Sequence, residues 1–171
     1  MEPSPVQYDK HPIISRIGGD LLNLSHAPIS DSDLACFAES DAAAIVAKIT
    51  TLWLDGTAIG DVGLGHLSVL KNLRVLNLKK TLVTDTGLAH LRGLTKLKLL
   101  ILSGTAVTDA GLDHLKPLGL LQDCEEEDDP ETEGNLQQVD LTGTRVTSAG
   151  RASLAEVVPE VVPEVVYEAI Y

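Results

Sequence analysis

Aromatic residues and cysteines are scarce in this chain of 171 residues. Only 3% of the residues are aromatic, with a single tryptophan, whereas 44% are hydrophobic. A core of this composition is aliphatic, built from Leu, Val, Ile and Ala, and the length fits one domain. The two cysteines, Cys36 and Cys124, are too few for a disulfide framework or a metal cluster. Their scarcity favours a reducing compartment, and we expect a cytoplasmic protein.

Long apolar runs and clusters of basic residues are also missing. No apolar stretch approaches the roughly 20 residues of a membrane-spanning helix, and the first residues lack the features of a signal peptide. Residues 121–135, LQDCEEEDDPETEGN, hold eight acidic residues and no basic one, so the rest of the chain carries only −4 of the net −12. Nucleic-acid binding needs clustered Lys and Arg. We therefore predict no membrane contact and no nucleic-acid partner, and we expect a monomer.

The sequence signatures of catalysis and of cation binding are absent as well. The chain has no Gly-rich phosphate loop, no G-x-S-x-G motif and no paired Cys and His outside the repeat described below. The acidic run lacks the alternating D-x-[DN]-x-[DN]-G spacing of a calcium loop, and its composition is typical of a solvated loop. We therefore predict a non-enzymatic protein without catalytic residues, bound metal or cofactor.

What the sequence does contain is a repeated stretch. TAVTDAGLDHL begins at Thr105, TLVTDTGLAHL at Thr81 and TAIGDVGLGHL at Thr57, each 24 residues from the next. A degraded copy, TRVTSAGRASL, begins at Thr144, 39 residues after Thr105, and the acidic run accounts for the difference. A group of residues that recurs at a fixed step indicates a structural building unit.

Each copy predicts one strand followed by one helix. Upstream of every Thr lies a segment of alternating apolar residues, and this period of two is typical of a strand. Downstream, the apolar spacing becomes helical, as at Leu88, Leu91 and Leu94. An acidic residue precedes each helical stretch in a position suited to capping its first turn. These predicted capping residues are Asp61, Asp85 and Asp109.

The pattern L-x-x-L-x-L-x-x-T-x-V-T-D-x-G-L-x-x-L-x-x-L resembles a leucine-rich repeat. It is similar to the bacterial GALA and cysteine-containing subtypes, with Thr where those place Asn or Cys. The resemblance covers about residues 19–158 in about five repeats, including a degraded first copy in which Leu22 aligns with Leu76 and Asp31 with Asp85. It implies an α/β fold, a right-handed solenoid shaped as a horseshoe arc, with a parallel sheet on the concave side and helices on the convex side.

Terminal segments are expected to close the ends of this stack. Residues 1–18 are interpreted as a mobile tail followed by a short capping helix from Pro12 to Gly18 and Gly19. Residues 19–158 form the repeat domain, with an acidic insertion at 122–135. Residues 159–171 are interpreted as a C-terminal cap, in which Val165–Ile170 forms a closing edge strand.

Histidines recur in the repeat and raise the possibility of a metal site. His66, His90 and His114 are 24 residues apart, and Cys36 falls in the same column. Stacked helices lie about 8 to 10 Å apart, whereas zinc needs nitrogens at about 2.0 to 2.1 Å. We therefore predict that the histidines are a partly exposed feature of the repeat and bind no metal.

Function in such an architecture is predicted from the strand residues that point outward on the concave side. These residues include the only tryptophan within an apolar patch that has a polar rim, a composition typical of a protein contact. The predicted binding residues are Trp53, Asp55, Val75, Asn77, Lys79, Leu99, Ile101 and Asp140. We predict a protein-protein interaction module.

Three alternatives stay open at this point. A tail or the acidic loop covers the patch within the same molecule. The chain is a substrate-receptor subunit of a ubiquitin-ligase-like enzyme complex, as the GALA resemblance suggests when an F-box precedes the repeats; residues 1–18 are too few for one. The chain is a structural piece of a larger repeat protein.

Overall fold

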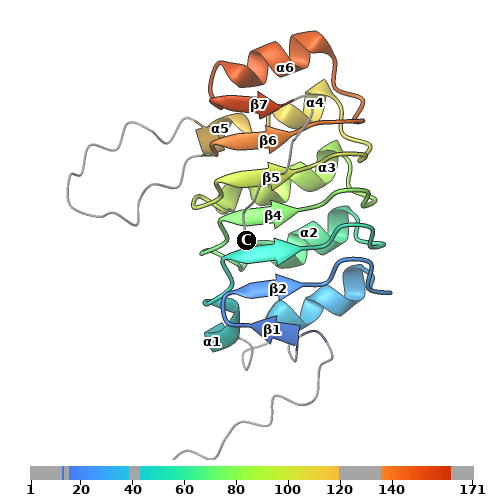
Figure 1. Cartoon of the computed structure of the whole chain (residues 1–171), viewed down its shortest axis with the longest axis vertical. Coiled ribbons are helices and arrows are strands. Elements are labelled where there is room, and N and C mark those ends of the chain that lie inside the picture. Colours follow the sequence, from blue (N-terminus) through green and yellow to red (C-terminus); the bar gives the residue numbers. More distant parts are fainter. Residues whose placement is uncertain (1–12, 14–15, 39–42, 120–135, 163–171) are drawn as a thin grey trace, which may run out of the picture.

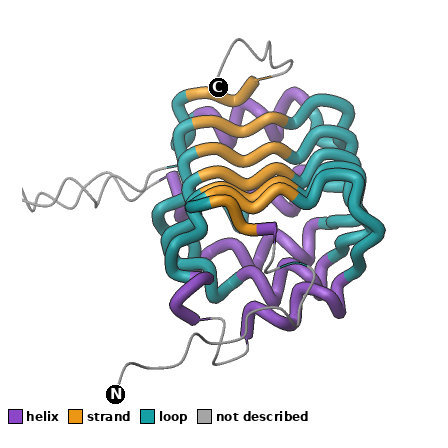
Figure 2. Tube along the Cα trace, turned by 60° about the horizontal axis from the view of Figure 1, so that its bottom comes forward, coloured by secondary structure: helices purple, strands orange, loops and turns teal. Residues whose placement is uncertain are grey.

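The computed structural model describes residue 13 and residues 16–38, 43–119 and 136–162. These residues form an α/β fold in which strands stack into one sheet and helices pack on one side of it (Figure 1). Viewed from a second direction, strands and helices form two separate layers (Figure 2). The other face of the sheet carries no described helix, and we call it the helix-free face.

The sheet has seven strands, which lie in the order of the chain from β1 to β7. Strands β2 to β7 are parallel, and β1 is antiparallel to β2. The strands are short, and their bounds are β1 Ile17–Gly18, β2 Leu21–Asn23, β3 Thr51–Trp53, β4 Val75–Asn77, β5 Leu99–Ile101, β6 Gln138–Asp140 and β7 Glu160–Val162.

From β2 onward, one helical segment or two return the chain from each strand to the next. Parallel pairing requires such a crossover, because each strand must begin at the same edge of the sheet. The helical segments are η3 Asp31–Ala38, α1 Ala43–Val46, α2 Asp61–Leu67, α3 Asp85–Leu88, η5 Ala89–Gly93, α4 Asp109–Leu112, α5 Lys116–Gly119 and α6 Ser148–Ala155, where η denotes a 3₁₀ helix.

The strand register confirms the alignment of the repeats. Leu52 of β3 pairs with Leu76 of β4, and Leu76 pairs with Leu100 of β5. The degraded first copy follows the same register, because Leu22 pairs with Leu52. Since side chains alternate along a strand, a one-residue shift would have turned every core leucine to the opposite face.

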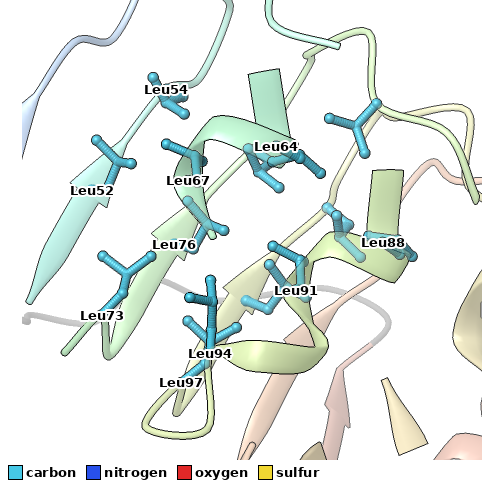
Figure 3. Packing of buried hydrophobic residues seen from close by; sticks show 14 of the residues in the cluster. Leu52, Leu54, Leu64, Leu67, Leu73, Leu76, Leu88, Leu91, Leu94 and Leu97 are labelled. Atoms are coloured by element: carbon cyan, nitrogen blue, oxygen red, sulfur yellow. The ribbon is translucent and has the colours of Figure 1, made fainter. Parts of the chain in front are cut away.

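The core is a continuous column of leucines between the strands and the helices. Figure 3 shows Leu52 and Leu76 of the sheet facing Leu67 and Leu91 of the helical layer, and all four are fully buried. Each repeat adds one layer of the same composition, so a repeat buries its apolar side chains only when a neighbour covers them. The predicted aliphatic core is thereby confirmed.

The N-terminal capping helix is predicted wrongly at its end. Ile17 and Gly18 form strand β1, which pairs with Leu22 and Leu21 through the two-residue turn Gly19–Asp20. Gly19 has φ of 75°, which favours glycine, and a Gly-Asp turn between two short strands is a typical hairpin connection. The remainder of the predicted helix, apart from residues 13 and 16, lies outside the described residues.

The last strand that the structure describes, β7, was not predicted from the sequence. Strand β7 is formed by Glu160–Val162, between the two prolines Pro159 and Pro163. The predicted strand Val165–Ile170 lies outside the described residues.

The acidic insertion leaves the sheet register unchanged. β5 pairs directly with β6, although residues 120–135, which lie outside the described part, come between them. The Leu136 amide donates to the Leu118 carbonyl at 3.1 Å, just as the Leu97 amide donates to the Leu94 carbonyl at 3.0 Å. The same turn is therefore closed in both repeats.

Deletion of residues 121–135 tests this arrangement. It places Leu136 three positions after Leu118, the spacing that Leu97 has from Leu94. We expect an unchanged far-UV circular dichroism spectrum and a free energy of unfolding within about 1 kcal/mol of the parent, because loop length contributes only weakly. Chemical denaturation measures this. A deletion that also removes α5, and with it the buried Leu118, is the control and should unfold the chain. Loss of cooperative unfolding in the shorter deletion would contradict the placement.

Candidate functional site

The helix-free face carries three rows of side chains that cross the strands. The middle residue of each strand from β2 to β6 is buried in the core, so its two neighbours face the other way. The first row is Leu21, Thr51, Val75, Leu99 and Gln138. The second row is Asn23, Trp53, Asn77, Ile101 and Asp140. The third row, just past the strands, is Ser25, Asp55, Lys79, Ser103 and Thr142.

All eight predicted binding residues fall into these rows, on β3 to β6 or directly after these strands. Trp53, Val75 and Leu99 are half-buried, so each shows part of its apolar surface on this face. Asp55 and Lys79, also half-buried, lie at the carboxyl ends of β3 and β4. The sequence alignment thus brings the predicted residues together on one side of the sheet.

Three of the predicted residues are much less accessible than a binding role suggests. Asn77 is 8% exposed, Ile101 4% and Asp140 3%. All three stand in the second row, next to one another on β4, β5 and β6. Ser103, which was not among the predicted binding residues, is buried beside them at 6% exposure.

Polar side chains of the second row also stabilise the turns that follow the strands. The Asn77 side-chain oxygen accepts a hydrogen bond from the Lys79 amide at 2.9 Å, and Asp140 accepts one from the Thr142 amide at 2.8 Å. Asx turns of this kind reverse the chain direction locally. Asn77 and Asp140 therefore have a structural role, and the apolar members of the rows are the better candidates for partner contact.

Asp55 is held by two side chains of the preceding repeat. One carboxylate oxygen accepts a hydrogen bond from Ser25 Oγ, and the other lies 3.2 Å from His26 Nε2. These contacts fix the carboxylate at the polar edge of the face. Its position is therefore set by contacts within the protein.

The aspartates that precede the helices do not cap their own helices, contrary to the sequence prediction. The N-cap residues are Gly60 for α2, Thr84 for α3, Thr108 for α4 and Thr147 for α6, and each acidic residue is the first residue inside its helix. Asp61 instead bonds to the next repeat, with one oxygen accepting from the Thr84 amide at 2.8 Å and the other from the Thr84 hydroxyl at 2.6 Å.

This contact recurs through the stack, and we call it the aspartate ladder. Asp85 makes the same pair of bonds to Thr108, and Asp109 makes it to Thr147. Asp31 begins the ladder with a bond from the Gly60 amide at 2.7 Å. The D-x-G motif is thus an inter-repeat connector.

Thr147 affects the acidity of the last carboxylate of the ladder. Hydrogen bonds from the Thr147 hydroxyl and amide lower the pKa of Asp109, and the charge of Arg151 acts in the same direction. A group whose pKa is lowered in the folded state stabilises that state above its unfolded pKa, and this contribution is lost as the pH falls through the folded value. The ladder contact to α6 is therefore sensitive to acid.

A column of glycines makes room for the ladder. A methyl group at Gly87 would lie 2.4 Å from Asp61 Oδ1, and one at Gly111 would lie 2.3 Å from Asp85 Oδ1. Real Cβ atoms do not approach oxygens so closely. The absence of a side chain at Gly111 is therefore needed by the aspartate of the neighbouring repeat.

The histidine column lies on the helical side of the molecule. His66 and His114 are half-buried and His90 is exposed, and His114 Nδ1 lies 2.7 Å from an Arg92 nitrogen. Cys36 is buried, and its Sγ lies 3.1 Å from the Asp33 carbonyl oxygen. Among the described residues, no group of three or more His, Cys, Asp and Glu is placed to hold a metal ion.

Comparison with known proteins adds no assignment. No protein-family model matches the chain, and no curated protein matches it. Within the described part of the chain, no helix is long and apolar enough to cross a membrane. The functional argument therefore depends on the geometry of the helix-free face.

Proposed function

We propose that the chain is a short leucine-rich-repeat solenoid that acts as a non-enzymatic protein-binding module. Its partner is a protein that contacts the helix-free face, which is the concave side of such a solenoid. A repeated strand-helix unit with a common register, a leucine column and a connector in every repeat supports the solenoid interpretation.

The observation that carries the binding proposal is the apolar group on the helix-free face. Val75 and Leu99 pair across β4 and β5, Trp53 lies in the adjacent row on the neighbouring strand β3, and all three are partly accessible. Interface anchors are enriched in aromatic residues that sit among apolar neighbours inside a polar rim. Asp55 and Lys79 provide that rim at the carboxyl ends of the strands.

Substitution of the tryptophan tests the proposal. The chain is immobilised, partners are captured from a native lysate, and the protein retained by wild type is titrated against purified variants. Trp53→Ala should weaken binding by about 2 kcal/mol or more, roughly 30-fold in Kd, because it removes the aromatic anchor. The fold should persist, since Trp53 points away from the leucine column, and circular dichroism checks this.

His90→Ala is the matched control on the opposite side. His90 is exposed and lies in η5, on the helical side, so its removal should change neither folding nor affinity. If His90→Ala abolishes binding in a folded protein while Trp53→Ala leaves it intact, the partner binds the helical side and the proposal is wrong.

A further inference from the structure

The Asp55 carboxylate is oriented by two side chains of the repeat before it. Ser25 Oγ donates a hydrogen bond to one oxygen, and His26 Nε2 lies 3.2 Å from the other. A carboxylate has about four positions at which it can accept hydrogen bonds, two on each oxygen. Asp55 can therefore bind a further donor without losing either of its present contacts.

His26 contacts Asp55 from a strained backbone conformation. Its φ is 55°, in the left-handed region, whereas three other repeats place glycine at the corresponding position, as Gly56, Gly104 and Gly143. Lys80 is the other exception, with φ of 54°. Residues with a Cβ atom adopt this conformation at a cost, and such strain is concentrated at functional sites. The strain at His26 is therefore associated with the orientation of Asp55.

The only tryptophan of the chain precedes Asp55 by two residues. Leu54 between them is fully buried in the core, so Trp53 and Asp55 point to the same side of the sheet. The backbone ladder continues through both, because the Leu24 amide donates to the Trp53 carbonyl and the His26 amide to the Asp55 carbonyl, each at 2.8 Å. Two residues of extended chain span about 6.6 Å. One long side chain of a partner can therefore reach the indole ring and the carboxylate together.

The charge around this pair favours a cation on the side of β2. His26 exposes 75% of its side chain and Asn23 is exposed, so the pair borders open surface there. Lys79 is the first basic residue of the third row, and it lies on the other side, after β4. Lys and Arg are absent from the three rows on β2 and β3, whose members besides the pair are Leu21, Asn23, Ser25 and Thr51.

We propose that Trp53 and Asp55 form a recognition site for a basic side chain of the protein partner, with His26 as the residue that positions Asp55. This inference rests on the proposed binding function and names the chemistry that the partner must present. A cation is attracted to the face of an indole ring, and the neighbouring carboxylate supplies the opposite charge. Arginine fits the pair best, because its planar guanidinium group can stack on the ring and still donate N–H groups to the carboxylate.

Binding of a small arginine analogue tests the site without a partner. N-acetyl-arginine amide is titrated into the full chain, and the indole N–H resonance of the single tryptophan is followed by NMR. We expect a saturable shift with a Kd on the order of millimolar, because one side chain supplies only a small part of the affinity of an interface. N-acetyl-citrulline amide has nearly the same shape without the charge, and it should give no saturable shift.

Isosteric substitution of the carboxylate tests its role. Asp55→Asn should weaken binding of the arginine analogue by about 5-fold or more, because it removes the charge with little change of shape. Asp113→Asn is the matched control. It makes the same change of charge at an exposed carboxylate after α4, where Asp113 pairs with Lys116, and it should leave the affinity unchanged.

His26→Gly separates positioning from stability. Glycine adopts the left-handed conformation without strain, so the melting temperature should stay the same or rise. The affinity for the arginine analogue should nevertheless fall by about 3-fold, because Asp55 loses one of the contacts that orient it. A lower melting temperature with unchanged affinity would show that His26 only stabilises the fold, and this part of the proposal would be wrong.

Three results would overturn the cation site: no saturable shift with the arginine analogue, an equal shift with the citrulline analogue, or unchanged affinity in folded Asp55→Asn. These failures are distinguishable from failure of the proposed binding function. If Trp53→Ala weakens binding of the captured partner but the arginine analogue does not bind, the face binds a protein and only the cation site is wrong. If the arginine analogue binds as expected but Trp53→Ala leaves partner binding intact, the cation site is supported and the proposed binding function is wrong.

Discussion

Leu76→Ala should lower the free energy of unfolding by about 2 to 5 kcal/mol. Leu76 is fully buried in β4, between Leu52 and Leu100 of the neighbouring strands. Truncation removes apolar contacts and leaves a cavity that neighbours on both sides keep open. Because domains are stable by only about 5 to 15 kcal/mol, this single change removes a large share of the total. Urea denaturation monitored by circular dichroism measures the loss.

Leu82→Ala is the control for that substitution. Leu82 lies in the loop after β4 and is 65% exposed, so its truncation should change stability by no more than about 0.5 kcal/mol. Equal effects of the two substitutions, or an unchanged melting temperature for Leu76→Ala, would contradict the strand register described above.

Gly111→Ala should cost about 2 to 4 kcal/mol, although alanine is the better helix former. Its methyl group would lie 2.3 Å from Asp85 Oδ1 and 3.1 Å from Asp85 Cα, so the aspartate must move. The movement breaks the bonds that Asp85 accepts from the Thr108 amide and hydroxyl. Thermal and urea unfolding of the variant give the size of the effect.

A second glycine in the same type of helix provides the matched control. A methyl group at Gly65 in α2 would meet its nearest neighbour, His90 Cε1, at an ordinary 3.7 Å. Gly65→Ala should therefore stabilise the protein by about 0.5 to 1 kcal/mol through helix propensity and reduced chain entropy. In an Asp85→Ala background the penalty of Gly111→Ala should shrink, and a double-mutant cycle measures this coupling. Destabilisation by both glycine substitutions, with no coupling to Asp85, would exclude the aspartate ladder as the cause.

Much of the fold follows from the sequence because the repeat constrains it many times over. The register and the leucine column were predicted correctly, since an alignment error at Leu76 would have had to recur in every copy. The role of Asp85 was predicted wrongly for a physical reason. A carboxylate at this position can cap the first turn of its own helix or accept hydrogen bonds from the next repeat. The distance between stacked repeats decides which of these two contacts forms.

The candidate site shows a similar limit. Alternation along the strands predicted that Trp53, Val75 and Leu99 share one face, because that depends on local backbone geometry alone. The low exposure of Ile101 depends on packing beyond its own strand, and strand periodicity contains no information about that. At the N-terminus, Pro12 suggested a helix, whereas the Gly19–Asp20 turn determines the actual hairpin.

The aspartate ladder gives the stack a direction. Every internal repeat receives one carboxylate from the repeat before it and offers one to the repeat after it, so internal repeats are interchangeable. The first described repeat contributes the Asp31 carboxylate to the next repeat. The last repeat, which contains α6, contacts the Asp109 carboxylate of the repeat before it but contributes no carboxylate, because Ser148 occupies the position of the aspartate. Insertion or loss of a whole internal unit would keep the chain of contacts unbroken. A further unit joined after α6 would find no carboxylate to receive, so lengthening of this array by duplication is expected to occur within it and not at its C-terminal end.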